Sequence, residues 1–96
     1  MYISVGSHRD SWSRGAIDPS TGLTAMLNTV LAFNKTMTYY DWRPRRSIIF
    51  AAWGAGEFGN IGSGEWVEEN SELLRQVQFT YELRYEHVCK KKVTDM

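Results

Sequence analysis

The chain contains 96 residues, with 11 Lys plus Arg against 11 Asp plus Glu. This length allows one small domain and excludes a second, because domains usually contain about 100 residues or more, and the lack of net charge excludes the electrostatic attraction by which proteins bind nucleic acid or anionic membranes. No apolar run approaches the roughly 20 residues that span a bilayer and no signal region opens the chain, so we expect neither a membrane segment nor a targeting signal within it.

The first half of the chain predicts a strand, a loop and a helix. Residues 2–6 are a short β-prone run that ends at a glycine, and the polar residues 7–15 follow as a loop. Asp18 and Pro19 indicate a helix start, with the aspartate as N-cap and the proline in the first turn. Apolar side chains then recur at helical spacing and predict a helix to about Lys35; they are Leu23, Met26, Leu27, Val30 and Leu31.

The second half predicts a strand, a helix and another strand. Residues 42–46 contain a proline and form a connection, and residues 47–53 are almost entirely apolar, as expected of a parallel strand buried on both faces. A glycine-rich turn precedes a helical segment from Glu65 to about Gln76, and residues 79–83 alternate like a third strand. The second helix is expected to bury Trp66, Leu73 and Leu74.

Strands that alternate with crossover helices are typical of parallel βαβ units. We therefore predict an α/β fold, namely a three-layer αβα fragment with a short, mainly parallel sheet. Residues 1–85 constitute this partial domain. Residues 86–96 lack hydrophobic periodicity and contain a run of lysines, so they are expected to be a disordered tail.

Three side chains with metal-binding chemistry should gather at one edge of this sheet. His8 follows the first predicted strand, Asp18 opens the first helix and Glu57 follows the second strand, and ligand sites of open α/β sheets lie beyond the carboxyl ends of the strands. Imidazole and carboxylate groups are zinc ligands, and one carboxylate can bridge two metal ions. Taken singly, the same residues have structural explanations: a loop histidine, a helix cap and a solvated turn residue.

Asp10 lies two residues beyond His8 and offers a second carboxylate in the same loop. It is a candidate for orienting the imidazole through the ring nitrogen that does not bind metal. The alternative is that it caps the loop.

Four blocks of sequence resemble, in the same order and at similar intervals, those of the glutamate carboxypeptidase II and transferrin receptor group of di-zinc peptidases. The resemblance extends from Tyr2 to about Tyr81 and implies a fragment of a zinc exopeptidase-like domain. The blocks are Gly6–Trp12 (GSHRDSW), Gly15–Pro19 (GAIDP), Trp42–Ala51 (WRPRRSIIFA) and Glu57–Ser63 (EFGNIGS).

The resemblance implies that His8 is a terminal zinc ligand, that Asp18 bridges both zinc ions and that Glu57 binds the second. In the family, the glutamate immediately before that last ligand is the general base that takes a proton from the attacking water, and this chain has Gly56 there. Loss of a positioned general base typically costs about 10²–10⁴ in rate. Two further family ligands, an aspartate after the next strand and a later histidine, have no match, and His87 is expected to be a solvated tail residue.

Two functions are therefore predicted as alternatives. The first is part of a zinc-dependent glutamate carboxypeptidase-like exopeptidase domain, inactive alone because the general base and some ligands are missing. The second is a non-catalytic binding or assembly module, similar to the transferrin receptor, a non-peptidase relative with glycine at the base position.

The resemblance also implies partners and a location. Substrates of the family are small peptides or acylated amino acids, many relatives are homodimers, and their peptidase-like domain usually lies on the extracellular side of the plasma membrane. Neither the membrane anchor nor the dimerisation segment of such relatives is found in this sequence.

Overall fold

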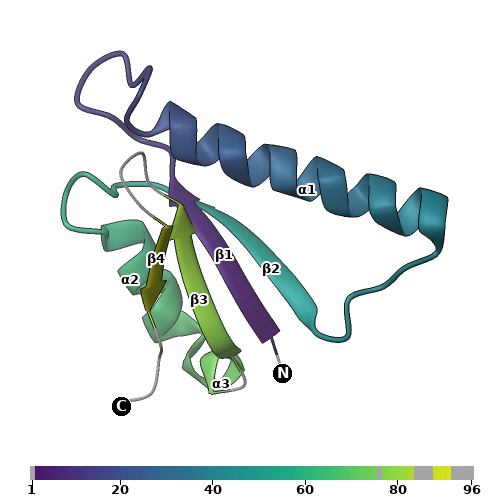
Figure 1. The fold of residues 1–96 in the computed structure, drawn as a ribbon. Helices are drawn as coiled ribbons and strands as arrows, with labels where there is room; N and C mark the ends of the chain where they lie inside the picture. The colour runs from purple at the N-terminus through teal and green to yellow at the C-terminus, as the bar shows by residue number, and fades with distance from the viewer. Residues whose placement is uncertain (1, 76, 84–87, 92–96) are drawn as a thin grey trace.

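The computed structural model describes residues 2–75, 77–83 and 88–91, with side chains for residues 2–75. Strands and helices alternate along most of the chain (Figure 1). The elements are β1 (Tyr2–His8), α1 (Ser20–Tyr40), β2 (Ser47–Trp53), α2 (Ile61–Glu69), α3 (Ser71–Leu74), β3 (Val77–Leu83) and β4 (Val88–Lys91).

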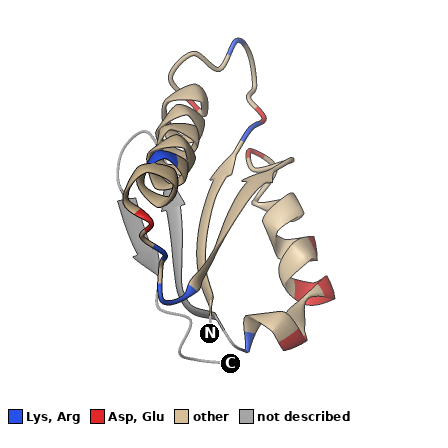
Figure 2. Ribbon diagram, turned by 90° about the vertical axis from the view of Figure 1, so that its right-hand side faces the viewer, with Lys and Arg blue, Asp and Glu red and all other residues tan. Residues whose placement is uncertain are grey.

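The four strands form one mainly parallel sheet in the order β2-β1-β3-β4. Strand β1 pairs in parallel with both β2 and β3, and only β4 is antiparallel to its neighbour. Helix α1 lies on one side of the sheet, and α2 and α3 lie on the other (Figure 2). This confirms the predicted three-layer α/β architecture.

The N-terminal elements differ from the prediction at their ends. Strand β1 continues for two residues to His8, so the histidine is the last residue of a central strand. Helix α1 begins at Ser20 with Pro19 at the N-cap position, and no side chain caps it. Asp18 is not the cap because its carboxylate faces His8 instead. The helix runs past Lys35 to Tyr40, since residues 36–40 contain neither glycine nor proline, and it ends where Asp41 adopts a left-handed conformation.

The C-terminal elements also depart from the predicted bounds. Strand β2 has the predicted range and direction, but it is an edge strand whose residues are mostly half-buried, not buried on both faces. The helix predicted from Glu65 starts earlier, at Ile61, and is interrupted at Asn70, whose side-chain amide and backbone N–H both donate to the carbonyl of Trp66. Trp66, Leu73 and Leu74 are half-buried.

The predicted tail over residues 86–96 contains a strand. Residues 88–91 pair with β3, in a register that places Val88 opposite Leu83. The pairing is possible because Val88 and Cys89 supply strand-compatible side chains before the lysines. The rest of the predicted tail lies outside the described residues. None of the helices in the described ranges has the length and hydropathy to cross a bilayer.

The core within residues 2–75 is small and partly polar. Met26 of α1 is the one large hydrophobic side chain in that range that is buried, and it remains 3% exposed. The buried side chains of β1 are polar, namely Ser4, Ser7 and His8. Large apolar side chains of α1 remain exposed, with Leu27 at 52% and Leu31 at 56%. The packing of the helices on the sheet therefore depends on few apolar contacts, and the stability of the fold should be sensitive to the loss of any one of them.

Met26→Ala is expected to lower the free energy of unfolding by about 2–5 kcal/mol, because it removes a buried side chain that the surroundings cannot replace. Leu27→Ala removes a half-exposed neighbour from the same helix and should cost only about 0.5 kcal/mol. Urea unfolding followed by circular dichroism measures both. Equal losses in the two variants would contradict the assignment of Met26 to the core.

Candidate metal centre

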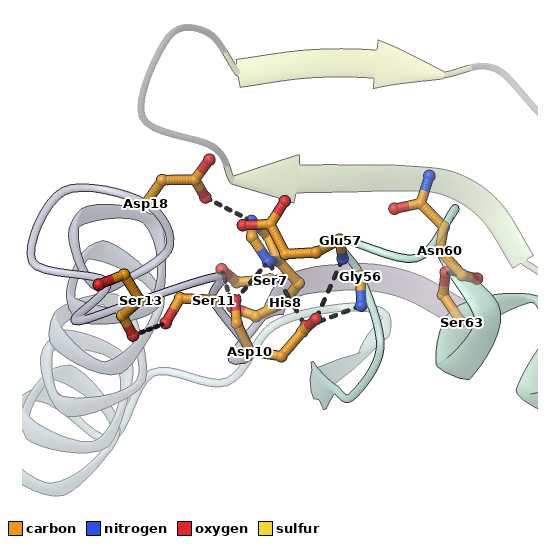
Figure 3. Close-up of polar contacts among 10 residues, drawn as sticks. All are labelled: Ser7, His8, Asp10, Ser11, Ser13, Asp18, Gly56, Glu57, Asn60 and Ser63. Atoms are coloured by element: carbon orange, nitrogen blue, oxygen red, sulfur yellow. Dashed lines mark hydrogen bonds and ion pairs between the residues drawn. The ribbon is translucent and has the colours of Figure 1, made fainter.

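The three predicted ligands lie together at the carboxyl ends of β1 and β2 (Figure 3). His8 ends β1, Asp18 lies in the turn before α1, and Glu57 lies in the loop after β2. One ligand atom from each side chain can be chosen so that all three lie within 4.8 Å of one another. The prediction that these residues gather at one sheet edge is confirmed.

The hydrogen bond at Nδ1 leaves the other ring nitrogen of His8, Nε2, available to bind a metal ion. Nδ1 lies 3.2 Å from the backbone carbonyl oxygen of Asp10. A carbonyl oxygen only accepts, so Nδ1 must carry the proton, and in the neutral imidazole Nε2 then carries the lone pair. His8 is only 6% exposed, so this orientation is held inside the structure. A backbone carbonyl at one ring nitrogen is a common way to prepare the other as a metal ligand.

The Nε2 lone pair faces a second acceptor. Oδ1 of Asp18 lies 2.9 Å from Nε2 of His8, yet this oxygen is buried and makes no hydrogen bond with the described residues. The two atoms are close without hydrogen-bond geometry, and two lone pairs at this distance repel each other unless a positive charge lies between or beside them. A proton on the imidazole supplies such a charge, and so does a metal cation bound by both atoms.

The donor set fits zinc. One imidazole nitrogen and two carboxylates are all common zinc ligands, at roughly 2.0–2.2 Å from the ion. In tetrahedral coordination two ligands of one ion therefore lie roughly 3.4 Å apart. The three ligand atoms lie within 4.8 Å of one another, so they would have to move closer together to bind one ion. The described residues thus present ligands for one ion, with Asp18 and Glu57 half-buried at the rim.

Asp10 contacts the second ring nitrogen of His8, the position predicted for it, but it does so through its backbone carbonyl. Its carboxylate lies 3.6 Å from Nδ1 of His8, beyond hydrogen-bond distance, and it is the backbone carbonyl that contacts the ring. The two carboxylate oxygens instead accept the backbone N–H groups of Gly56 at 2.7 Å and Glu57 at 3.1 Å. Asp10 therefore orients the imidazole with its main chain and anchors the loop that carries Glu57 with its side chain.

The same hydrogen bonds account for the acidity of Asp10. Partial removal from water raises the pKa of this carboxyl, but the amides of Glu57 and Gly56 stabilise the charged form and, with His8, lower the pKa below its ordinary value. The carboxylate is therefore the form that holds the loop.

The loop after β2 is also held by its own backbone. Successive carbonyls of Gly54, Ala55 and Gly56 accept the N–H groups of residues 62, 61 and 60 at 3.0–3.2 Å. Ala55 and Asn60 take left-handed conformations, with φ values of 52° and 59°, and Gly59 has a φ of 92°. These residues reverse the chain sharply, which returns Glu57 to the edge of the sheet before α2 begins.

An aromatic contact joins the two loops that carry the candidate ligands. The rings of Trp12 and Phe58 have centroids 4.7 Å apart and are tilted by 55°. Both side chains are exposed, by 69% and 61%. On the other side of the loop, Trp53 packs on Trp66 of α2 with centroids 5.2 Å apart. Aromatic packing therefore supports the loop after β2, in addition to the hydrogen bonds that the loop makes with Asp10.

The contact of the Asp10 carboxylate with the loop after β2 was not predicted, although the position of Asp10 relative to the ends of the strands indicates it. A carboxylate two residues beyond the end of a strand neighbours the loop that follows the adjacent parallel strand, where backbone N–H groups are free to donate. His87, which was expected to be a solvated tail residue, lies outside the described residues.

Residues 1–85 match the profile of peptidase family M28. The chain is 49% identical over 80 residues to rat "Aminopeptidase NAALADL1", 45% identical over 80 residues to maize "Probable glutamate carboxypeptidase VP8" and 42% identical over 80 residues to "Glutamate carboxypeptidase 2 homolog" of Caenorhabditis briggsae. Each match covers 83% of this chain and only 10–11% of the relative. No solved structure gives a significant match.

The Asp10 contacts predict a pH-dependent loop. Because folding lowers the pKa of Asp10, its ionised carboxylate stabilises the folded loop at pH values above the unfolded pKa of about 3.9. This stabilisation is lost as the pH falls through the folded-state pKa. The amide proton resonances of Gly56 and Glu57 should therefore move upfield together on acidification, because protonation of Asp10 weakens both hydrogen bonds. Two-dimensional NMR of the metal-free chain measures this.

Asp10→Asn should abolish that coupled shift, whereas Asp41→Asn, which changes an exposed carboxyl after α1, should leave it intact. A coupled shift that persists in Asp10→Asn would contradict the assignment.

Proposed function

Because the chain belongs to peptidase family M28, we propose that it forms the metal-binding part of a zinc-dependent, glutamate carboxypeptidase-like peptidase domain and does not hydrolyse peptides by itself. One observation carries the proposal: Nε2 of His8 and the buried Oδ1 of Asp18 face each other at 2.9 Å without a hydrogen bond, in a cluster that Glu57 completes. This arrangement suits a cation better than it suits the side chains alone.

The proposed ligands are His8, Asp18 and Glu57. Zinc, when bound, supplies Lewis acidity that polarises a carbonyl and acidifies water. The family resemblance implies two zinc ions, but three ligands shared between two ions leave each with too few, since a catalytic zinc usually has three protein ligands. We therefore expect this chain to hold a single ion, and a second ion would require ligands that the described residues do not supply.

The chain has no general base at the position where the family resemblance places one. Position 56 is glycine, so no side chain there can accept a proton from an attacking water. Its N–H is already donated to Asp10 at 2.7 Å, and its carbonyl accepts the N–H of Asn60 at 3.0 Å. We infer that the metal site is retained while the base function is lost.

Gly56 also supports a second candidate function, a non-catalytic module for binding or assembly, similar to the transferrin receptor. The chain spans about a tenth of the length of the curated relatives that it matches. The substrate class of small peptides or acylated amino acids, a homodimeric state and an extracellular location at the plasma membrane are therefore proposals. Each depends on residues beyond those of this chain.

The metal proposal predicts about one zinc ion per folded chain after dialysis. Elemental analysis measures the stoichiometry, with competition against a chelating dye for the affinity. His8→Ala, Asp18→Asn and Glu57→Gln should each remove or greatly weaken binding, because each deletes one of three ligands. Glu68→Gln on the exposed face of α2 is the matched control and should bind like the unaltered chain. Absence of zinc from the folded, unaltered chain would refute the metal site.

The base proposal predicts no measurable release of glutamate or of an N-terminal amino acid from small peptides by the zinc-loaded chain, since a missing general base alone costs about 10²–10⁴ in rate. Hydrolysis that is lost in His8→Ala would overturn this proposal and would favour a working enzyme. Zinc binding without hydrolysis is expected of both candidate functions. A partner retained equally by the zinc-loaded and metal-free chain would favour the binding module.

A further inference from the structure

Helix α1 carries a three-residue pattern that the metal site does not use. Asn34, Lys35 and Thr36 satisfy the Asn-x-Thr pattern of acceptors for N-linked carbohydrate, in which the middle residue is not proline. None of the other three asparagines of the chain is followed two residues later by serine or threonine. The sequence therefore directs attention to the surroundings of Asn34.

Asn34 lies on the outer side of the helix. Its side chain is exposed, whereas the adjacent Phe33 is half-buried and packs on Phe50 of β2 with ring centroids 6.0 Å apart. Helix α1 leads away from the carboxyl end of β1 (Figure 1). Because the helix begins at Ser20 and rises 1.5 Å per residue, Asn34 lies roughly 21 Å along it. A carbohydrate on Asn34 would project into solvent and leave the metal centre open.

Exposed apolar side chains share this side of the helix. Leu31 and Leu27 precede Asn34 by three and seven residues, the spacing of side chains along one face of an α-helix. They are 56% and 52% exposed. Neighbouring apolar side chains at a surface favour association, and N-linked carbohydrate is bulky and solubilising. Carbohydrate on Asn34 would lie beside both leucines.

The folded helix separates the asparagine from the threonine of the pattern. Two residues along an α-helix turn through about 200°, so the side chains of Asn34 and Thr36 leave the helix on different faces. The hydroxyl of Thr36 also donates to the carbonyl of Ala32 at 2.9 Å. A transferase that recognises both side chains together can therefore bind them only while this segment is extended.

We propose that Asn34 is a site of N-linked glycosylation, that it is modified before α1 folds, and that the carbohydrate covers Leu27 and Leu31. The proposal rests on the extracellular location proposed above, since the transferase acts on exported chains, and not on the metal ligands. The side-chain nitrogen of Asn34 forms a bond to the anomeric carbon of an oligosaccharide carried by a lipid diphosphate. The bond from that carbon to the phosphate oxygen breaks, the lipid diphosphate leaves, and the nitrogen releases one proton.

Cell-free translation with membrane vesicles that contain the transferase tests the site, with a cleavable secretion signal ahead of the full chain. The chain should gain one oligosaccharide, and a glycan-specific amidase should remove it to leave aspartate at position 34 in the mass spectrum. Asn34→Gln and Thr36→Ala should both abolish the modification. Thr38→Ala is the matched control, because it removes a helix hydroxyl outside the pattern, and it should be modified fully. An unmodified chain, or undiminished modification of Thr36→Ala, would overturn the proposal.

The order of events is tested by offering the transferase and lipid-linked oligosaccharide a chain that has already been released and folded. The unaltered folded chain should accept no carbohydrate. Ala32→Pro, which disrupts the interior of α1, should restore transfer to Asn34. Modification of the folded, unaltered chain as efficient as that of the nascent chain would contradict transfer before folding.

A dye that fluoresces on apolar surfaces tests the covering. The glycosylated chain should bind less dye than Asn34→Gln, and Leu27→Gln with Leu31→Gln should remove the difference. Equal dye binding with and without carbohydrate would refute the covering. Zinc stoichiometry of the same two samples keeps this proposal apart from the proposed function. If neither sample binds zinc, the metal site fails, while the mass of the chain still decides whether Asn34 is glycosylated.

Discussion

The site depends on one interaction, the pair of hydrogen bonds from the amides of Gly56 and Glu57 to the carboxylate of Asp10. Asp10 follows β1, while the two amides follow β2, so the contact joins segments that are 46 and 47 residues apart. It fixes how far the second loop lies from His8. Without it, only the exposed contact of Trp12 with Phe58 would join the loop that carries Glu57 to the loop after β1.

The same contact matters for the fold because the apolar core is small. Two layers of helices cover the sheet, yet Met26 is the only large hydrophobic side chain among residues 2–75 that is buried. Polar groups occupy the buried positions of the central strand, and buried polar groups stabilise a fold only when they are paired. The hydrogen bonds at the carboxyl end of the sheet therefore contribute to folding as well as to the site. A change that loosens the site is expected to loosen the layers around it.

The sequence was sufficient for the order of elements, the parallel sheet and the meeting of His8, Asp18 and Glu57, because strand ends in a parallel sheet share one edge. It was insufficient where particular side-chain contacts decide the outcome. Asp18 has the chemistry of a helix cap, and only the approach of His8 shows that its carboxylate is used elsewhere. Asn70 interrupts a helix-compatible segment through its own side chain, and β4 forms where periodicity gave no signal. Asp10 was expected either to orient the imidazole or to cap its own loop, whereas its carboxylate binds a loop from the far half of the chain.

Gly56 is constrained by contacts of several of its main-chain atoms. Its N–H is bound to Asp10, its carbonyl to Asn60, and its Cα is packed on His8. Gly56 is thus tied through its main chain to the loop after β1 and to the start of α2, so the residue that lacks the side chain of a base still holds the loop that carries Glu57.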